Sequence, residues 1–189
     1  MININKDDFI NNKIWVTSKI RMEAEERRIA KKNKLFIFFN SITTLTLILS
    51  ILDMVIKNND KIINFSLFNI ILSIALIVLS LIISNYDLSK EAFDFRKSYL
   101  ELENLMYDSD RYNENELKLE YSKILERHLN HNNLDFIYFK ITQRKNNNNN
   151  FSYNNFEYLM YLFDKYTLNI IIFIIVIIII ALSYHYIIV

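Results

Sequence analysis

The chain has 189 residues, in which 22 Lys and Arg nearly balance 21 Asp and Glu, and it contains no Gly, Pro or Cys. The lack of Cys excludes disulfides, thiolate nucleophiles and zinc ribbons. The lack of Gly excludes the phosphate-binding turns of P-loop and dinucleotide-binding proteins. The balanced charge gives no overall affinity for nucleic acid, so no direct nucleic-acid partner is expected. Because neither helix breaker is present, long uninterrupted helices are predicted.

The first 34 residues are a charged segment that we predict to form a cytoplasmic helix. Asp7 and Asp8 suit a helix start, and good helix formers follow up to residue 34. The segment lacks the short apolar core of a signal peptide, so no cleavage is expected. Its end is basic, and the residues concerned are Arg27, Arg28, Lys31, Lys32 and Lys34.

Two apolar stretches, residues 35–56 and 65–84, are separated by only the eight hydrophilic residues 57–64. At about 1.5 Å per helical residue, each stretch reaches across the roughly 30 Å hydrocarbon core of a bilayer. The short turn forces the two helices to lie side by side and antiparallel. Residues 35–84 are therefore predicted to form a transmembrane helical hairpin.

A charged region, residues 85–144, follows the hairpin and is predicted to be cytoplasmic and helical. Apolar residues in 87–107 recur at alternating spacings of four and three, the pattern of a coiled-coil seam. The residues of this seam are Leu88, Ala92, Phe95, Tyr99, Leu102 and Met106. We expect this helix to pair antiparallel with the N-terminal helix. Further helices are predicted near 115–129 and 134–144, and residues 145–166 are predicted to be an Asn-rich linker.

The last 23 residues, 167–189, contain no Asp, Glu, Lys or Arg, and we predict a third transmembrane span there. Lys and Arg number nine in residues 1–34, two in the turn and eleven in residues 85–166. Basic segments stay in the cytoplasm. The N-terminus is therefore predicted inside the cell (inner) membrane and the C-terminus outside. The expected fold is an all-α integral membrane protein: a long antiparallel transmembrane hairpin continuous with cytoplasmic helices, plus a C-terminal transmembrane helix.

Both spans of the hairpin carry a polar stripe. In the first span, the polar residues that fall within about 80° of the helix circumference are Thr43, Thr46, Ser50 and Asp53. In the second span, those within about 60° are Ser66, Asn69, Ser73, Ser80 and Ser84. Such stripes either line a pore between several hairpins or let helices pack closely, and both interpretations stay open. Asp53 favours the pore because a charge inside a span is costly, although it also lies one turn from the outer end.

The N-terminal helix places Thr17, Arg21, Ala24 and Arg28 on one face. This face is either solvated or forms ion pairs with acidic residues of the neighbouring helix, which carries Glu91, Asp94, Glu101 and Glu103. His128 and His131 have no Cys and few carboxylates nearby, so no metal site is predicted. Without Gly, no Ser is set up as a nucleophile. We predict no catalytic residue and no cofactor, and the sequence argues against an enzyme.

Three short motifs occur in a fixed order around the hairpin. The first is the run 14–28, whose marked residues are Trp15, Thr17, Arg21, Ala24 and Arg28; it leads directly into the hairpin. The others are the run 93–102 and the pairs Asn130-His131 and Asp135-Phe136. Over about residues 9–144 the chain resembles the SLATT family, the SMODS- and SLOG-associating two-transmembrane effector domains. The apolar tail indicates a subgroup with an added C-terminal span.

The resemblance implies a pore-forming membrane effector of a bacterial anti-phage or conflict system, which acts by abortive infection. It implies a homo-oligomer in contact with membrane lipid, triggered by a nucleotide signal or by a soluble sensor encoded nearby. No catalytic residues are attributed to the family. Two other hypotheses are a membrane-anchored scaffold that recruits a soluble partner through its cytoplasmic helices, and an autonomous holin-like toxin that needs no partner.

Overall fold

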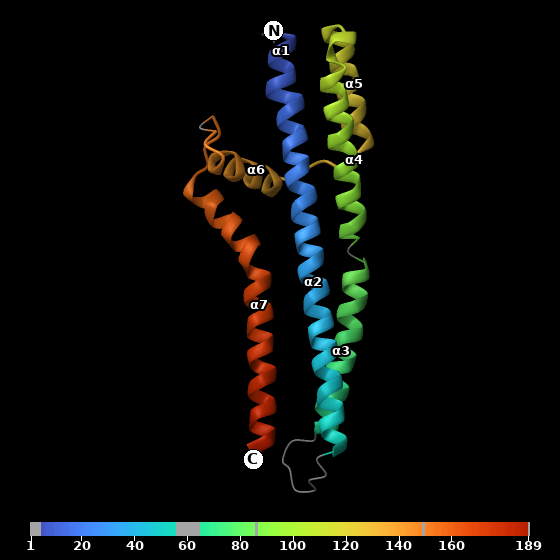
Figure 1. The fold of residues 1–189 in the computed structure, drawn as a ribbon, viewed down its shortest axis with the longest axis vertical. Coiled ribbons are helices and arrows are strands. Elements are labelled where there is room, and N and C mark those ends of the chain that lie inside the picture. The colour runs from blue at the N-terminus through green and yellow to red at the C-terminus, as the bar shows by residue number, and fades with distance from the viewer. Residues whose placement is uncertain (1–4, 56–64, 86, 149, 189) are drawn as a thin grey trace. The chain divides into compact units, whose positions relative to one another are not determined.

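A computed structural model describes residues 5–55, 65–85, 87–148 and 150–188, and every regular element in these ranges is a helix (Figure 1). In chain order they are α1 (Lys6–Phe9), the π-helical turn η1 (Ile10–Ile14), α2 (Trp15–Val55), α3 (Phe65–Asn85), α4 (Leu88–Tyr107), the 3-10 turn η2 (Ser109–Arg111), α5 (Glu114–Arg127), α6 (Asn133–Lys145) and α7 (Asn155–Ile188). The expected all-α fold is confirmed.

The chain divides into two compact units. The first, which we call the charged unit, comprises Met1–Lys31 and Leu88–Phe163. The second, the apolar unit, comprises Lys32–Asp87 and Asp164–Val189. Helices α2 and α7 each contribute residues to both units.

Asparagine fills the positions at which many proteins use glycine or serine to begin and end helices. Asn113 and Asn132 precede α5 and α6, and each forms a capping box with the acidic residue three positions later. At the end of α6, Asn147 has a φ of 61°. The N–H of Asn148 donates to the carbonyl of Gln143 at 3.0 Å, which completes a Schellman motif. Asn tolerates this left-handed conformation better than most residues, so a chain without Gly still ends the helix sharply.

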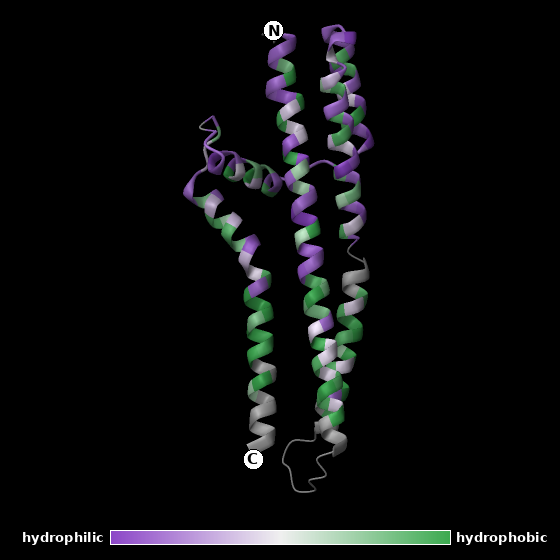
Figure 2. Ribbon diagram, in the orientation of Figure 1, coloured by the Kyte–Doolittle hydropathy of each residue, from purple (hydrophilic) through white to green (hydrophobic). Residues whose placement is uncertain are grey.

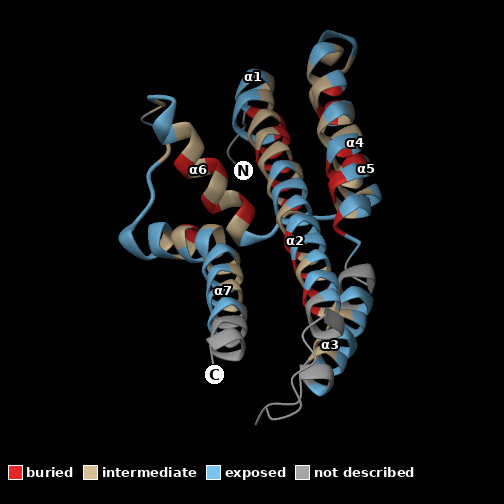
Figure 3. Cartoon of the chain, turned by 60° about the horizontal axis from the view of Figure 1, so that its bottom comes forward, coloured by how far each residue is buried: buried red, intermediate tan, exposed pale blue. Residues whose placement is uncertain are grey.

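The charged unit has a core in which α1, η1, α4 and α5 meet. The buried residues of this core are Phe9, Ile14, Leu102, Leu105, Leu117 and Ile124 (Figure 3). The predicted coiled-coil seam of residues 88–106 lies on α4 and is called the α4 seam below. Four of its six positions, Leu88, Ala92, Phe95 and Leu102, are buried. A second cluster, Ile137, Ile141 and Tyr161, joins α6 to the first turns of α7.

Helices α2 and α4 run antiparallel within the charged unit, as their ion pairs show. Lys19 pairs with Glu103 at 3.2 Å, and Arg28, further along α2, pairs with Glu91, further back along α4, at 3.2 Å. The predicted antiparallel pair of the N-terminal helix and the helix after the hairpin is therefore confirmed.

The apolar unit contains the second half of α2, helix α3 and most of α7, and most of the described residues of these segments are hydrophobic, as Figure 2 shows in green. Within the described residues, two helical stretches are long and apolar enough to cross a membrane, Lys6–Ile51 and Asn155–Ile177. Helix α3 has the length of the second predicted span, and its stretch Asn69–Leu81 is a shorter apolar helix. The predicted turn, 57–64, lies outside the described residues.

The linker before the third span is shorter than expected. Helix α6 extends to Lys145 and α7 begins at Asn155, so residues 155–166 of the predicted linker 145–166 are helical. The Asn run separates the two helices, but the sequence that follows it already suits a helix. Asn154 and Glu157 form a capping box there, with bonds of 2.7 and 3.0 Å.

Candidate functional site

The residues of the N-terminal motif lie on one side of α2 and point into the charged unit. Thr17, Arg21, Ala24 and Arg28 are at most 9% exposed. Trp15 is half-buried, with its ring 6.2 Å from that of Phe139 on α6. This face is therefore not solvated, and interhelical ion pairs were the better of the two interpretations.

Arg28 is held by partners from two other helices. Its Nη1 bonds to Asp135 at the start of α6, and its Nε donates to Glu91 on α4 at 3.2 Å. The guanidinium also lies 4.7 Å from the ring centre of Phe95. Each contact uses a different part of the planar guanidinium, which a Lys ammonium cannot do.

Asp135 is the residue that ties α6 to α2. Its carboxylate is fully buried and also pairs with Arg27 at 3.0 Å. It accepts the N–H of Asn132 at 2.9 Å as part of the capping box. A buried carboxylate needs several hydrogen-bond donors, because removing its charge from water costs free energy that these contacts must offset.

Arg21 differs from Arg28 in having no such partners. It is fully buried, and none of its three guanidinium nitrogens has a hydrogen-bond partner among the described residues. Burial lowers the pKa of Arg21, and the nearby Tyr121, Asp94 and Glu101 oppose that shift. Arg21 is therefore a desolvated cation near two carboxylates to which it forms no hydrogen bond in the described part of the chain.

His128, directly after α5, lies close to both of those carboxylates. Its Nδ1 lies 2.9 Å from Asp94, and its Nε2 lies 3.3 Å from Glu101. Asp94 also accepts the N–H of Leu129 at 2.7 Å. The pKa of Asp94 is lowered: desolvation acts to raise it, but these hydrogen bonds to the ionised form outweigh desolvation.

The polar side chains of the first span face its own helix or α3. The hydroxyls of Thr43, Thr46 and Ser50 donate to the carbonyls four residues earlier, at 2.8 to 2.9 Å. Asn69 of α3 donates to the Ser50 hydroxyl at 2.5 Å, which links the two helices of the hairpin. The side chain of Asp53 lies outside the described residues.

The second stripe is divided between two environments. Asn69 is half-buried against α2, whereas Ser73 and Ser80 are exposed. Ser73 bonds only to its own helix, donating to the Asn69 carbonyl at 2.8 Å. The side chains of Ser66 and Ser84 lie outside the described residues.

A comparison with protein families matches residues 4–186 to the SMODS and SLOG-associating 2TM effector domain family 5. The chain belongs to this SLATT family. The match extends into α7 and therefore includes the third apolar segment. No curated protein and no solved structure matches the chain.

Two residues of this SLATT protein were missed as site residues by reasoning from the sequence. Asp135 entered the argument only through the resemblance, although its place three residues after Asn132 marks a capping box. His128 was considered only as a metal ligand. Within the described residues, no group of three or more His, Asp or Glu is arranged to hold a metal ion, and His128 instead hydrogen-bonds to Asp94 and lies beside Glu101.

Proposed function

We propose that the chain is a homo-oligomeric effector that permeabilises the bacterial inner membrane during phage infection, when a sensor or nucleotide signal acts on its charged unit. The family name describes an effector domain that associates with SMODS and SLOG proteins, which supports the effector role. The long apolar helices support a place in the membrane. The proposal puts the N-terminus in the cytoplasm and assigns no catalytic residue.

The observation that carries the pore is the exposure of Ser73 and Ser80 on α3. They lie one heptad apart on the same helix face, and both are exposed, although Asn69 of the same stripe is half-buried and donates to Ser50 of α2. Lipid chains offer no hydrogen-bond partner to hydroxyl groups on an otherwise apolar exposed surface. When several hairpins assemble, these serines supply polar groups to a water-filled wall.

Helix α2 offers a route from signal to pore. It is one unbroken helix, Trp15–Val55, that carries both the buried arginines of the charged unit and the polar residues of the first span. A partner that binds more tightly when Arg21 and Arg28 are packed differently would shift the equilibrium between alternative arrangements of α2. The polar surfaces of the spans would then move into contact with water.

The test replaces both serines and measures membrane potential. Ser73→Leu/Ser80→Leu, expressed with its genomic partner, is expected to lose depolarisation measured with a potential-sensitive dye. The matched control is Ile70→Leu/Ile77→Leu, because these residues are also exposed and one heptad apart on α3. The control should depolarise as the parent does. Equal depolarisation by both double variants, each inserted in the membrane, would overturn the pore.

The two alternative functions have different requirements. A scaffold that recruits a partner through the α4 seam needs accessible side chains, but Phe95 is only 1% exposed and serves the internal packing. A holin-like toxin should depolarise cells when expressed without any partner. Depolarisation that depends on the partner favours the effector.

A further inference from the structure

We propose that Arg21 and His128 compete for the same two carboxylates, so that the charged unit has a second packing in which Arg21 replaces His128. The contested carboxylates belong to Asp94 and Glu101 on α4. The segment that moves is the non-helical α5–α6 connection, residues 128–132. The proposal rests on the proposed function, because it names the contact through which a signal on the charged unit would act.

The α5–α6 connection is held against α4 through the contested carboxylates. His128 Nδ1 lies 2.9 Å from Asp94, and the N–H of Leu129 donates to the same carboxylate at 2.7 Å. His128 Nε2 lies 3.3 Å from Glu101. These contacts last only while residues 128–132 stay beside α4. When the connection moves away, both carboxylates lose these partners and become accessible to another cation.

Arg21 lies along the stretch of the α2–α4 contact that contains the contested carboxylates. Lys19 precedes it on α2 and Arg28 follows it, and the two form ion pairs with α4. The partners in these pairs, Glu103 and Glu91, enclose the contested carboxylates along α4. Because the two helices run antiparallel, Arg21 lies opposite that segment of α4, and the charges of both carboxylates reach its guanidinium.

Arg21 gains from the exchange because it is buried without a partner. None of its three guanidinium nitrogens has a hydrogen-bond partner among the described residues. A guanidinium has five N–H donors and can bind a carboxylate through two parallel bonds. Such a pair would offset the loss of the bonds to the connection, since an unpaired buried charge is costly. His131 of the connection also has a buried Nδ1 without a partner in the described part of the chain, and water would reach it after the movement.

A bound anion suits Arg21 less well than the carboxylates of the chain itself. Ser18, one turn before Arg21, and Ser98, between the contested residues along α4, have fully buried hydroxyls that lack a partner within the described residues. Donors of this kind can bind a small anion. The contested carboxylates act on the same guanidinium, however, and their negative charges would repel an anion there. The second packing supplies Arg21 with a partner that the protein already contains.

Hydrogen–deuterium exchange at the Leu129 N–H tests the competition, since this N–H loses its acceptor when the connection leaves α4. The full-length parent, Arg21→Met, His128→Ala and the double variant are compared in detergent, with residue resolution. Arg21→Met removes the competitor and should slow exchange at Leu129 several-fold. His128→Ala removes the present partner and should speed exchange several-fold, but only while Arg21 is present. The N–H of Leu117, which donates to the Asn113 carbonyl at 2.9 Å, reports unfolding of the whole unit and is the internal reference.

The matched control variant is Arg111→Met, which removes an exposed arginine and should leave both rates unchanged. The competition is overturned if Arg21→Met leaves exchange at Leu129 unchanged, speeds it, or slows Leu117 equally. Equal acceleration by His128→Ala with and without Arg21 would overturn it as well. If His128→Ala does not fold, the comparison of the parent with Arg21→Met decides by itself. The readout requires no depolarisation. Failure here with a successful serine test therefore rejects only the competition, and the reverse pattern rejects only the pore.

Discussion

Arg28 and Asp135 are 107 positions apart in the sequence, and their side chains form a buried ion pair. The pair connects the first half of α2 to the start of α6, and Arg27 and Glu91 extend it to a network of four charges. Since α2 continues into the first span, this network fixes the part of the helix through which the proposed signal would pass.

Removing the Asp135 charge should strongly destabilise the charged unit. Asp135→Asn leaves Arg27 and Arg28 buried without their shared partner, and the expected loss is about 3–5 kcal/mol. The matched control is Asp108→Asn, which breaks a solvent-exposed pair with Arg111 and should cost less than about 1 kcal/mol. Thermal unfolding in detergent, followed by the fluorescence of the single tryptophan, Trp15, measures both. Similar losses in the two variants would contradict the assigned role of Asp135.

The two buried arginines should respond in opposite ways to the same substitution. Arg28→Met removes a paired charge and should destabilise the protein, as Asp135→Asn does. Arg21→Met removes a buried charge without hydrogen bonds, so stability should stay the same or increase. The same unfolding measurement compares them. If Arg21→Met destabilised as much as Arg28→Met, Arg21 would have a partner that the structure does not show.

Lowering the pH should reveal the bonds of Asp94. The pKa of Asp94 is lower in the folded protein than in the unfolded chain. Its contribution to the free energy of unfolding is therefore fully present above the unfolded pKa, near 4, and is lost as the pH falls through the folded pKa. The melting temperature of Asp94→Asn should therefore be lower than that of the parent at pH 7, and the difference should shrink below pH 4. A difference independent of pH would assign the effect to packing.

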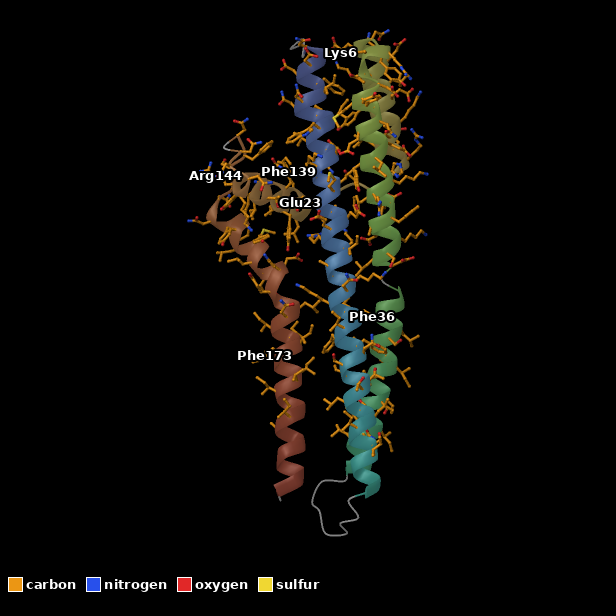
Figure 4. The ribbon with its side chains drawn as sticks, viewed as in Figure 1. Lys6, Glu23, Phe36, Phe139, Arg144 and Phe173 are labelled. Carbon is orange, nitrogen blue, oxygen red and sulfur yellow. The ribbon has the colours of Figure 1, made fainter. Side chains whose placement is uncertain are left out.

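Glu23 should show the opposite dependence on pH. Burial raises its pKa, followed in importance by a hydrogen bond with Thr142 that acts against the shift. Because the pKa of Glu23 is higher in the folded protein than in the unfolded chain, its contribution to stability is fully present below the unfolded pKa. That contribution is lost as the pH rises through the folded pKa. Glu23→Gln should therefore raise the melting temperature at pH 7 and leave it unchanged near pH 4. Figure 4 shows Glu23 beside α6, where Phe139 lies.

The bond between Asn69 and Ser50 should contribute modestly to the hairpin. Asn69→Leu removes it, and interhelical hydrogen bonds in membranes are worth about 0.6–2 kcal/mol. Ser73→Leu is the control, because Ser73 bonds only to its own backbone. Resistance of the membrane-embedded hairpin to unfolding in increasing SDS compares the two. A larger effect of Ser73→Leu would place Ser73, and not Asn69, in a helix contact.

The sequence alone determined where most of the helices lie and which of them suit a membrane, although it placed the start of α7 in a linker. Both properties are local: the absence of Gly and Pro permits long helices, and a continuous apolar stretch signals a span whatever its neighbours. The α4 seam was likewise predictable, because the spacing of Phe95 and Leu102 by itself identifies a buried face.

The tertiary structure alone decided which polar residues have partners. Arg21 and Arg28 look alike in the sequence, yet one is fully buried without a hydrogen bond and the other is paired with Asp135. Ser73 and Asn69 share a stripe, yet only Asn69 reaches the neighbouring helix. The physical reason is that pairing depends on which distant segment meets each helix face. Helical periodicity gives the direction of a side chain, but the chain must fold to supply the group that lies opposite.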